Sequence, residues 1–132
     1  MTRTVNHEEV MAVRALPAPE RYEYFIKWVA DAEQLWGLRS DQGWVVASDE
    51  AGREIFPVWS DSIYAEACRE EPWGDSLPTA ISLEEWRTKW LPGLKRDGRR
   101  VAVFPIRGGE VGVVVDADRL RLDLEAVESE LY

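Results

Sequence analysis

The sequence predicts one α+β domain, an antiparallel sheet of about five strands with four to five helices packed mainly on one face. Amphipathic helical patterns and short β-branched runs follow one another along the chain, and glycine-containing turns separate the runs. The 132 residues suffice to bury one core without disulfides. We expect residues 1–132 to form this single domain, with a short N-terminal helix in residues 1–17 and the main body in residues 18–132.

Two helices are predicted at the start of the chain. Asn6 is a suitable N-cap for a helix over about residues 7–15, and Pro19 suits the first turn of a second helix that extends to about residue 34. The apolar side chains of the second helix cover well over half of its circumference, so we expect its own domain or a partner to cover it on more than one side. These side chains are Tyr22, Tyr24, Phe25, Ile26, Trp28, Val29 and Ala32.

A three-stranded meander is predicted next, over residues 35–39, 44–48 and 53–59. Gly43 and Gly52 fall in the tight turns between these runs, and Gly43 stands in a place suited to positive φ. Pro57 lacks an N–H group, so its strand is expected to lie at an edge of the sheet or to end there.

The middle of the chain predicts a helix, a loop and a second helix. Ser60 or Asp61 caps a helix that extends to about residue 70, with an inner face of Ile63, Tyr64, Ala67 and Cys68. Residues 70–79 are expected to form one long surface loop. Ser82 and Glu85 match a capping box that starts the next helix.

The last helix of this middle part and the C-terminal elements follow from similar signals. The apolar stripe of the helix after Ser82 is Leu83, Trp86, Trp90 and Leu91, and the Pro92–Gly93 pair is expected to end or sharply bend it. A hairpin is predicted over residues 99–106 and 111–115, with its turn at residues 108–109. Asp116 then caps a helix with Leu120, Leu124, Val127 and Leu131 on one face.

Composition and charge exclude several classes of function. The chain is 45% hydrophobic and 31% charged, and its net charge is −9 at neutral pH. A negative field repels nucleic-acid phosphates and anionic lipids, so we expect no nucleic-acid or membrane partner, although solubility alone would also explain the charge. The single cysteine and the lack of an apolar segment near residue 1 predict a cytoplasmic protein.

The sequence contains no recognisable catalytic motif, which favours a protein that is not an enzyme. Cys68 and the only histidine, His7, have no sequence context that joins them, and they are too few for an ordinary zinc site. We therefore expect no catalytic residue, metal or cofactor. An acidic cluster lacks calcium-loop spacing and is interpreted as a solvated face; it comprises Asp61, Glu66, Glu70, Glu71 and Asp75.

Tryptophan is the unusual feature of the composition, with seven residues. Six fall on predicted core faces, whereas Trp73 lies in the irregular loop and is either an interface anchor or a staple that pins the loop to the core. We predict a non-enzymatic protein-binding or regulatory module with a protein partner, a basic one being complementary in charge. The candidate patch is Trp59, Asp61, Tyr64 and Trp73. The broad apolar helix would also suit a homodimer.

The alternative is a small carboxylate-based hydrolase or a small-molecule-binding protein with a Trp-lined pocket. Carbohydrate sites combine carboxylates and tryptophan stacking in this way. The 25 acidic residues make some carboxylate pair eligible in any fold, so this signal has little specificity.

Several segments resemble the bacterial family catalogued as domain of unknown function 2750. They are Tyr24-Phe25, Trp36-Gly37-Leu38, Gly43-Trp44, Pro57-Val58-Trp59, Tyr64-Ala65, Ile81 to Trp86, Trp90-Leu91-Pro92-Gly93-Leu94, Asp97-Gly98 and Val101 to Pro105. The resemblance covers nearly the whole chain from about residue 20, and its ending at Asp116 to Leu124 is looser. It implies an α+β fold and no known activity. The order of elements is also similar to that of the enhanced serine sensitivity proteins, at the level of the fold.

Overall fold

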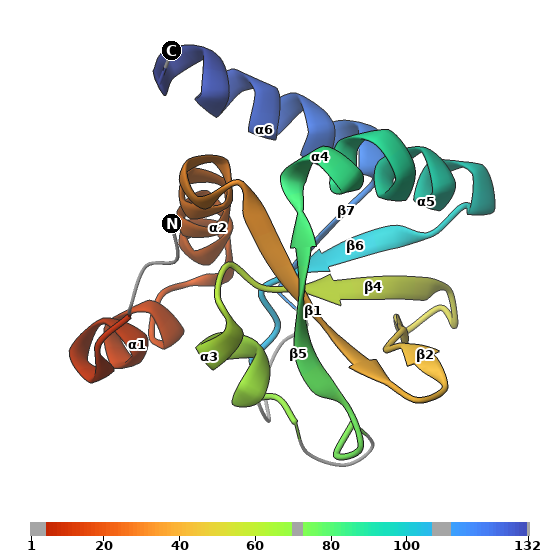
Figure 1. Cartoon of the computed structure of the whole chain (residues 1–132), viewed down its shortest axis with the longest axis horizontal. Coiled ribbons are helices and arrows are strands. Elements are labelled where there is room, and N and C mark those ends of the chain that lie inside the picture. Colours follow the sequence, from red (N-terminus) through yellow and green to blue (C-terminus); the bar gives the residue numbers. More distant parts are fainter. Residues whose placement is uncertain (1–4, 70–72, 107–111, 132) are drawn as a thin grey trace.

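The chain adopts an α+β fold in a computed structural model that describes residues 5–69, 73–106 and 112–131 (Figure 1). This confirms the predicted fold class. The helical elements are α1 (His7–Arg14), α2 (Ala18–Ala32), α3 (Ser62–Glu66), α4 (Leu83–Glu85), η1 (Trp86–Trp90), α5 (Leu91–Asp97) and α6 (Ala117–Leu131). The strands are β1 (Gln34–Ser40), β2 (Gly43–Trp44), β3 (Ala47–Ser48), β4 (Glu54–Val58), β5 (Leu77–Ser82), β6 (Arg100–Val103) and β7 (Val113–Val115).

The strands form two sheets where one was predicted. Their orders are β2-β1-β5 and β3-β4-β6-β7, and all pairs are antiparallel except the parallel pair β4–β6. The two sheets meet at a bridge in which Trp36 and Trp59 exchange backbone hydrogen bonds of 2.9 and 2.8 Å. The predicted meander is therefore wrong, whereas the predicted hairpin between β6 and β7 is confirmed by their antiparallel register.

The run predicted as one strand over residues 44–48 divides between the two sheets. Trp44 pairs with Arg39 of β1, and the Val45 N–H still donates to Leu38 of the same strand at 2.8 Å. Ala47 then pairs with Ile55 of β4. A single short segment therefore passes from one sheet to the other, which a local pattern of apolar residues does not reveal.

Pro57 lies inside its sheet, so its predicted edge position is wrong. Strand β4 has β3 on one side and β6 on the other. The last pair with β3 is Ala47 with Ile55, and the next contact on that side is the bridge at Trp59. Pro57 occupies the gap between them, where no ladder hydrogen bond calls for an N–H group. The strand itself ends one residue later, at Val58.

The loop predicted over residues 70–79 is shorter, because Leu77 already belongs to β5. This strand pairs antiparallel with β1 from Leu77 opposite Arg39 to Ser82 opposite Gln34. Pro78, which falls in the predicted loop, belongs to β5, which is an edge strand, and an edge position tolerates proline. Residues 70–72 lie outside the described residues, as does the predicted turn at residues 108–109.

The helix capped by Ser82 continues past Pro92, so of the two predicted alternatives, an end or a sharp bend at Pro92–Gly93, the end is wrong. Ser82 Oγ accepts a hydrogen bond from the Glu85 N–H at 3.1 Å, as the capping box predicted. A π-helical turn, η1, precedes the proline, and the Leu91 N–H donates to the Trp86 carbonyl five residues back. This wider turn accommodates the missing N–H of Pro92, and the helix ends only at Gly98, where φ is 69°.

The other helix caps agree with the sequence. Asn6 accepts from the Glu9 N–H, Asp61 rather than Ser60 caps α3, and Asp116 accepts from the Arg119 N–H. Helix α3 ends at Glu66 rather than near residue 70. Ile63, predicted on its inner face, is 40% exposed.

Within the described residues, α4, η1 and α5 form one continuous stretch, so there are five helical segments, in agreement with the predicted four to five. Helix α6 packs against α2 and α5, whereas α3 lies against β1 and β5 (Figure 1). Helix α2 contacts both sheets, through β1 and β7, whereas the strands that α3 contacts, β1 and β5, belong to one sheet, so the helices do not share one face of a single sheet. Large buried side chains of the core between them include Phe25, Val29, Leu35, Leu38, Ile55, Trp59, Trp86, Phe104 and Leu120.

Candidate functional site

The seven tryptophans divide into interior and half-buried residues. Trp59 and Trp86 have no exposed surface. The other five rings keep part of their surface in contact with solvent; they are Trp28, Trp36, Trp44, Trp73 and Trp90. Packing in the core therefore accounts fully for two of the rings, and the exposed parts of the remainder mark where a ligand or partner can reach.

Trp73 packs onto the core by way of Trp59. Their ring centroids are 6.4 Å apart and the planes are nearly perpendicular, at 76°. Beneath this contact, the Trp59 indole N–H donates to the Pro105 carbonyl at 2.9 Å. The sequence allowed two interpretations of Trp73, an interface anchor or a residue that holds its loop to the core. The contact with Trp59 shows that Trp73 holds its loop to the core, and its ring is still half-buried.

The other two residues of the predicted patch hold the neighbouring backbone and core. Asp61 caps α3 through a 3.4 Å hydrogen bond from the Ile63 N–H. Tyr64 is only 2% exposed, and its ring packs against Phe104 with centroids 4.7 Å apart. Trp59 and Tyr64 are thus interior residues. Within the predicted patch, Trp73 and Asp61 are the side chains that a partner could touch.

Trp73 lines a polar groove of about 480 Å³ on the side of the β1–β2 hairpin. Asp41, at the hairpin turn, and Asp75, in the Trp73 loop, are its charged lining residues. The remaining lining residues are Ser40, Gln42, Val45 and Ser76. Sequence reasoning singled out Asp75 but missed Asp41, because the β1–β5 pairing that brings the two segments together is a long-range contact.

The Trp73 loop is held in place by hydrogen bonds to its own backbone. Ser76 donates to the Trp73 carbonyl through both its hydroxyl, at 2.6 Å, and its backbone N–H, at 3.1 Å. The Arg69 guanidinium donates to the Gly74 carbonyl at 3.3 Å. The ring is therefore presented by an ordered turn, which lowers the entropy that binding would cost.

A second hollow, the aromatic cleft, lies between the β2–β4 region and α5 and has a volume of about 460 Å³. Its aromatic lining residues are Trp44, Phe56 and Trp90, and Lys89, Asp97 and Arg99 contribute charge. This is the counterpart of the Trp-lined pocket that the sequence offered as an alternative. Sequence reasoning named the tryptophans but did not bring Trp44 and Trp90 together.

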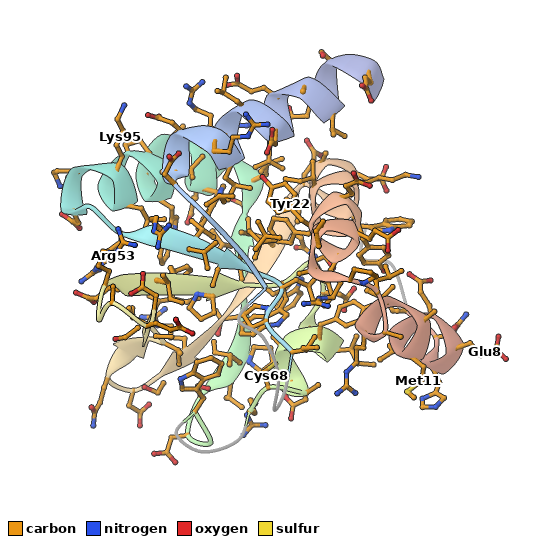
Figure 2. All side chains as sticks on the ribbon, turned by 180° about the vertical axis from the view of Figure 1, so that it is seen from behind. Glu8, Met11, Tyr22, Arg53, Cys68 and Lys95 are labelled. Carbon is orange, nitrogen blue, oxygen red and sulfur yellow. The ribbon has the colours of Figure 1, made fainter. Side chains whose placement is uncertain are left out.

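Cys68 and His7, the two reactive side chains considered in the sequence, lie in places that suggest no joint chemistry. Cys68 is buried in the body of the molecule (Figure 2), and its thiol donates to the Pro105 carbonyl at 3.4 Å. His7 is exposed in the first turn of α1. Among the residues that the structure describes, no group of three His, Cys, Asp or Glu side chains is placed to hold a metal ion.

The pKa values of Tyr22 and Asp49 are shifted from their ordinary values. Burial, and then the hydrogen bond and charge of Asp123, raise the pKa of Tyr22, whose hydroxyl donates to that carboxylate at 2.5 Å between α2 and α6 (Figure 2). A backbone hydrogen bond from Arg53, assisted by the Arg100 side chain, lowers the pKa of Asp49. Neither Tyr22 nor Asp49 lines the Trp73 groove or the aromatic cleft; Tyr22 and Asp123 line a separate hollow of about 520 Å³ between α2 and α6. The hydrogen bonds of Tyr22 and Asp49 are expected to act on stability.

No helix in the described parts of the chain has the length and apolar character that crossing a bilayer requires. Fold and hollows together define an acidic α+β protein with two open, tryptophan-lined depressions. A family model described as "Protein of unknown function (DUF2750)" matches residues 22–124, so the chain belongs to this family, as its sequence resemblance indicated. A comparison with curated proteins finds no match.

Proposed function

We propose that this protein is a non-enzymatic protein-binding module and that its contact surface is the Trp73 groove. The observation that carries the proposal is a half-buried tryptophan in a groove whose charged lining residues, Asp41 and Asp75, are both acidic. Aromatic residues anchored in place are typical centres of protein interfaces. The occupant is a basic segment of the partner.

The chemistry of the groove favours a lysine or arginine side chain. A cation over a tryptophan face gains about 0.5–1 kcal/mol at an exposed site, and more when water is excluded. Asp41 and Asp75 supply carboxylates for charge-assisted hydrogen bonds from the same cation. The net charge of −9 would also speed the approach of a basic surface.

The four residues of the patch predicted from the sequence have different roles in this proposal, either contact with the partner or support of the fold. Trp73 contacts the partner, and Trp59 supports the Trp73 ring from below. Asp61 and Tyr64 fix α3 and the core beside the loop. Replacing Trp59 or Tyr64 is therefore expected to weaken binding only as far as it loosens the fold.

Site-directed photo-crosslinking in the protein's own cells tests the proposal. Leu77 follows Ser76 of the groove and is 59% exposed, so a benzoylphenylalanine at this position would report on an occupant. The matched control is the same probe at Leu122 of α6, which is 50% exposed. We expect adducts with basic proteins from position 77 and not from position 122.

Charge variants decide whether the groove causes the adducts. The double substitution Asp41→Asn with Asp75→Asn should abolish the position-77 adducts. The control, Glu20→Gln with Asp31→Asn on exposed positions of α2, changes net charge equally and should leave them. Adducts at position 77 that survive the groove variant, or that are lost equally in the control, would contradict the proposed surface.

A small carboxylate-based hydrolase is the second candidate, favoured by the presence of two carboxylates and a tryptophan in one groove. It predicts turnover of chromogenic glycosides that is lost in both Asp41→Asn and Asp75→Asn. A panel without turnover above the double variant would reject it.

A further inference from the structure

The aromatic cleft is a second hollow, separate in its lining residues from the Trp73 groove. Trp90 stands edge-on to Trp44, with centroids 5.0 Å apart and planes at 87°, and is tilted against Phe56 at the same distance. Trp44 and Trp90 both remain partly exposed, so their rings are accessible from the hollow. The β2–β4 region and α5 that supply the cleft occupy the right-hand side of the molecule in Figure 1.

The backbone beneath the cleft is shaped to hold these rings. A Cβ atom at Gly37 would lie 3.1 Å from Cζ3 of Trp44, so the glycine lets the indole lie close across β1. On the opposite side, Trp90 is the last residue of the π-helical turn, and it stacks on the buried Trp86 at 5.9 Å. Single π-helical turns inside helices are frequent at functional sites because they alter the direction of side chains.

The rim of the cleft is positively charged, in contrast to the protein as a whole. Lys89 lines the cleft and makes no ion pair or hydrogen bond with any residue that the structure describes. Arg99 also lines it and lies 3.3 Å from Glu54 on the surface. The acidic lining residue, Asp97, is paired with Arg96 at 3.3 Å.

A further cation lies behind the first ring of the cleft. The guanidinium carbon of Arg39 is 5.6 Å from the centroid of Trp44. Because Arg39 and Trp44 are directly paired across β1 and β2, their side chains emerge on the same face of the sheet. Three cations, Lys89, Arg99 and Arg39, thus lie at the cleft against the two carboxylates of Asp97 and Glu54, in a chain whose net charge is −9.

We propose that the aromatic cleft binds a small planar aromatic anion, whose ring packs on the exposed parts of Trp44 and Trp90 and whose anionic group is held by Lys89 and Arg99. A volume of about 460 Å³ is within the ordinary range for small-molecule sites. The lining combines aromatic and aliphatic side chains with three charged residues, Lys89, Asp97 and Arg99, which can fix the orientation of a ligand. A phosphate on a nucleoside or a carboxylate on an aromatic ring would present the same chemistry.

Isothermal titration calorimetry with paired probes tests this proposal and separates the two sources of the anion. The nucleotide pair is AMP with adenosine, and the carboxylate pair is indole-3-carboxylate with indole. We expect at least one anion to bind about five-fold or more tightly than its neutral counterpart, whereas inorganic phosphate and acetate, which lack a ring, bind more weakly than that anion. The pair that responds identifies the source.

Variants of the charged rim and of single tryptophans place the binding in the cleft. Lys89→Gln and Arg99→Gln should each weaken the bound anion about three- to ten-fold, and Lys27→Gln, which removes the same charge from exposed α2, should not. Trp44→Leu should abolish binding and Trp73→Leu should leave it unchanged, with circular dichroism confirming that both variants are folded.

Three results would overturn the proposal: no preference for either anion over its neutral partner, equal weakening by Lys27→Gln and Lys89→Gln, or loss of binding in a folded Trp73→Leu. These outcomes are distinguishable from failure at the Trp73 groove, because the crosslinking experiment there does not involve Trp44, Lys89 or Arg99.

Discussion

Two glycines with almost the same positive φ permit a direct measurement of how tightly the β6–β7 region is packed. Gly52, in the turn before β4, has φ of 80°, and Gly112, just before β7, has φ of 83°. A Cβ atom at Gly52 would meet nothing within 4 Å. At Gly112 it would lie 2.1 Å from the Val103 carbonyl oxygen and 2.9 Å from that of Phe104.

Alanine substitution at the two positions therefore separates strain from overlap. Gly52→Ala adds only the cost of an L-residue at positive φ, about 1–2 kcal/mol of unfolding free energy. Gly112→Ala adds the same strain and an overlap with backbone atoms that cannot rotate away, for which overpacking suggests a further 1–3 kcal/mol. The expected losses are about 1–2 and 2–5 kcal/mol, the larger being a substantial part of the stability of a small domain.

Urea unfolding followed by tryptophan fluorescence measures both losses, provided that the slope of free energy against urea is unchanged between variants. The reasoning would be refuted if the two alanine variants agreed within about 0.5 kcal/mol, because the backbone of β6 would then not be fixed against Gly112.

The shifted pKa values of Tyr22 and Asp49 predict two pH-dependent effects on stability. Tyr22→Phe removes the hydrogen bond to Asp123 and should cost about 1 kcal/mol at pH 8. Because the pKa of Tyr22 is raised in the folded protein, this advantage is lost as pH rises above about 10, so wild type and variant should converge in urea unfolding at pH 11. Asp49→Asn should destabilise the protein at pH 7. The pKa of Asp49 is lowered by the Arg53 backbone, so the wild-type advantage disappears as pH falls below about 4, and a difference that persisted unchanged in thermal unfolding at pH 3 would contradict this assignment.

Local signals in the sequence predicted most helix starts. Asn6, Asp61, Ser82 and Asp116 each cap a helix in the structure through the hydrogen bond that their residue type suggests. Such caps depend on two or three neighbouring residues, so a single sequence is sufficient to find them. The strand pairing was less accessible, because the parallel pair β4–β6 joins segments more than forty residues apart.

Proline was the least reliable signal. Pro57 predicted an edge or the end of its strand, Pro78 lay in a predicted loop, and Pro92 predicted the end or a sharp bend of its helix. Each is accommodated by its surroundings: a gap between two ladder contacts, an edge strand and a π-helical turn. The missing N–H group is costly only where a partner carbonyl awaits it. Whether one does is decided by tertiary pairing, which the residues around the proline do not reveal.

The candidate sites show the same division between local and distant information. The sequence pointed to Trp73 because its loop composition is irregular, and that residue lies in a groove. Asp41 was overlooked because it belongs to a hairpin turn some thirty residues away. In the aromatic cleft, Trp44 was interpreted as a core residue, since nothing nearby in the sequence indicates that Trp90 and a cationic rim stand opposite it.

The two hollows share one hairpin, and the alternation of a strand explains how. Trp44 and Val46 line the aromatic cleft, whereas Val45 between them lines the Trp73 groove. Successive side chains in an extended segment point to opposite faces, so the cleft and the groove lie on opposite sides of the same backbone. A strand that alternates polar and apolar residues would present an apolar side chain to one of the two hollows only. The apolar run Trp44-Val45-Val46 instead presents an apolar side chain to each hollow, so a substitution at Val45 should affect the groove alone and one at Trp44 the cleft alone.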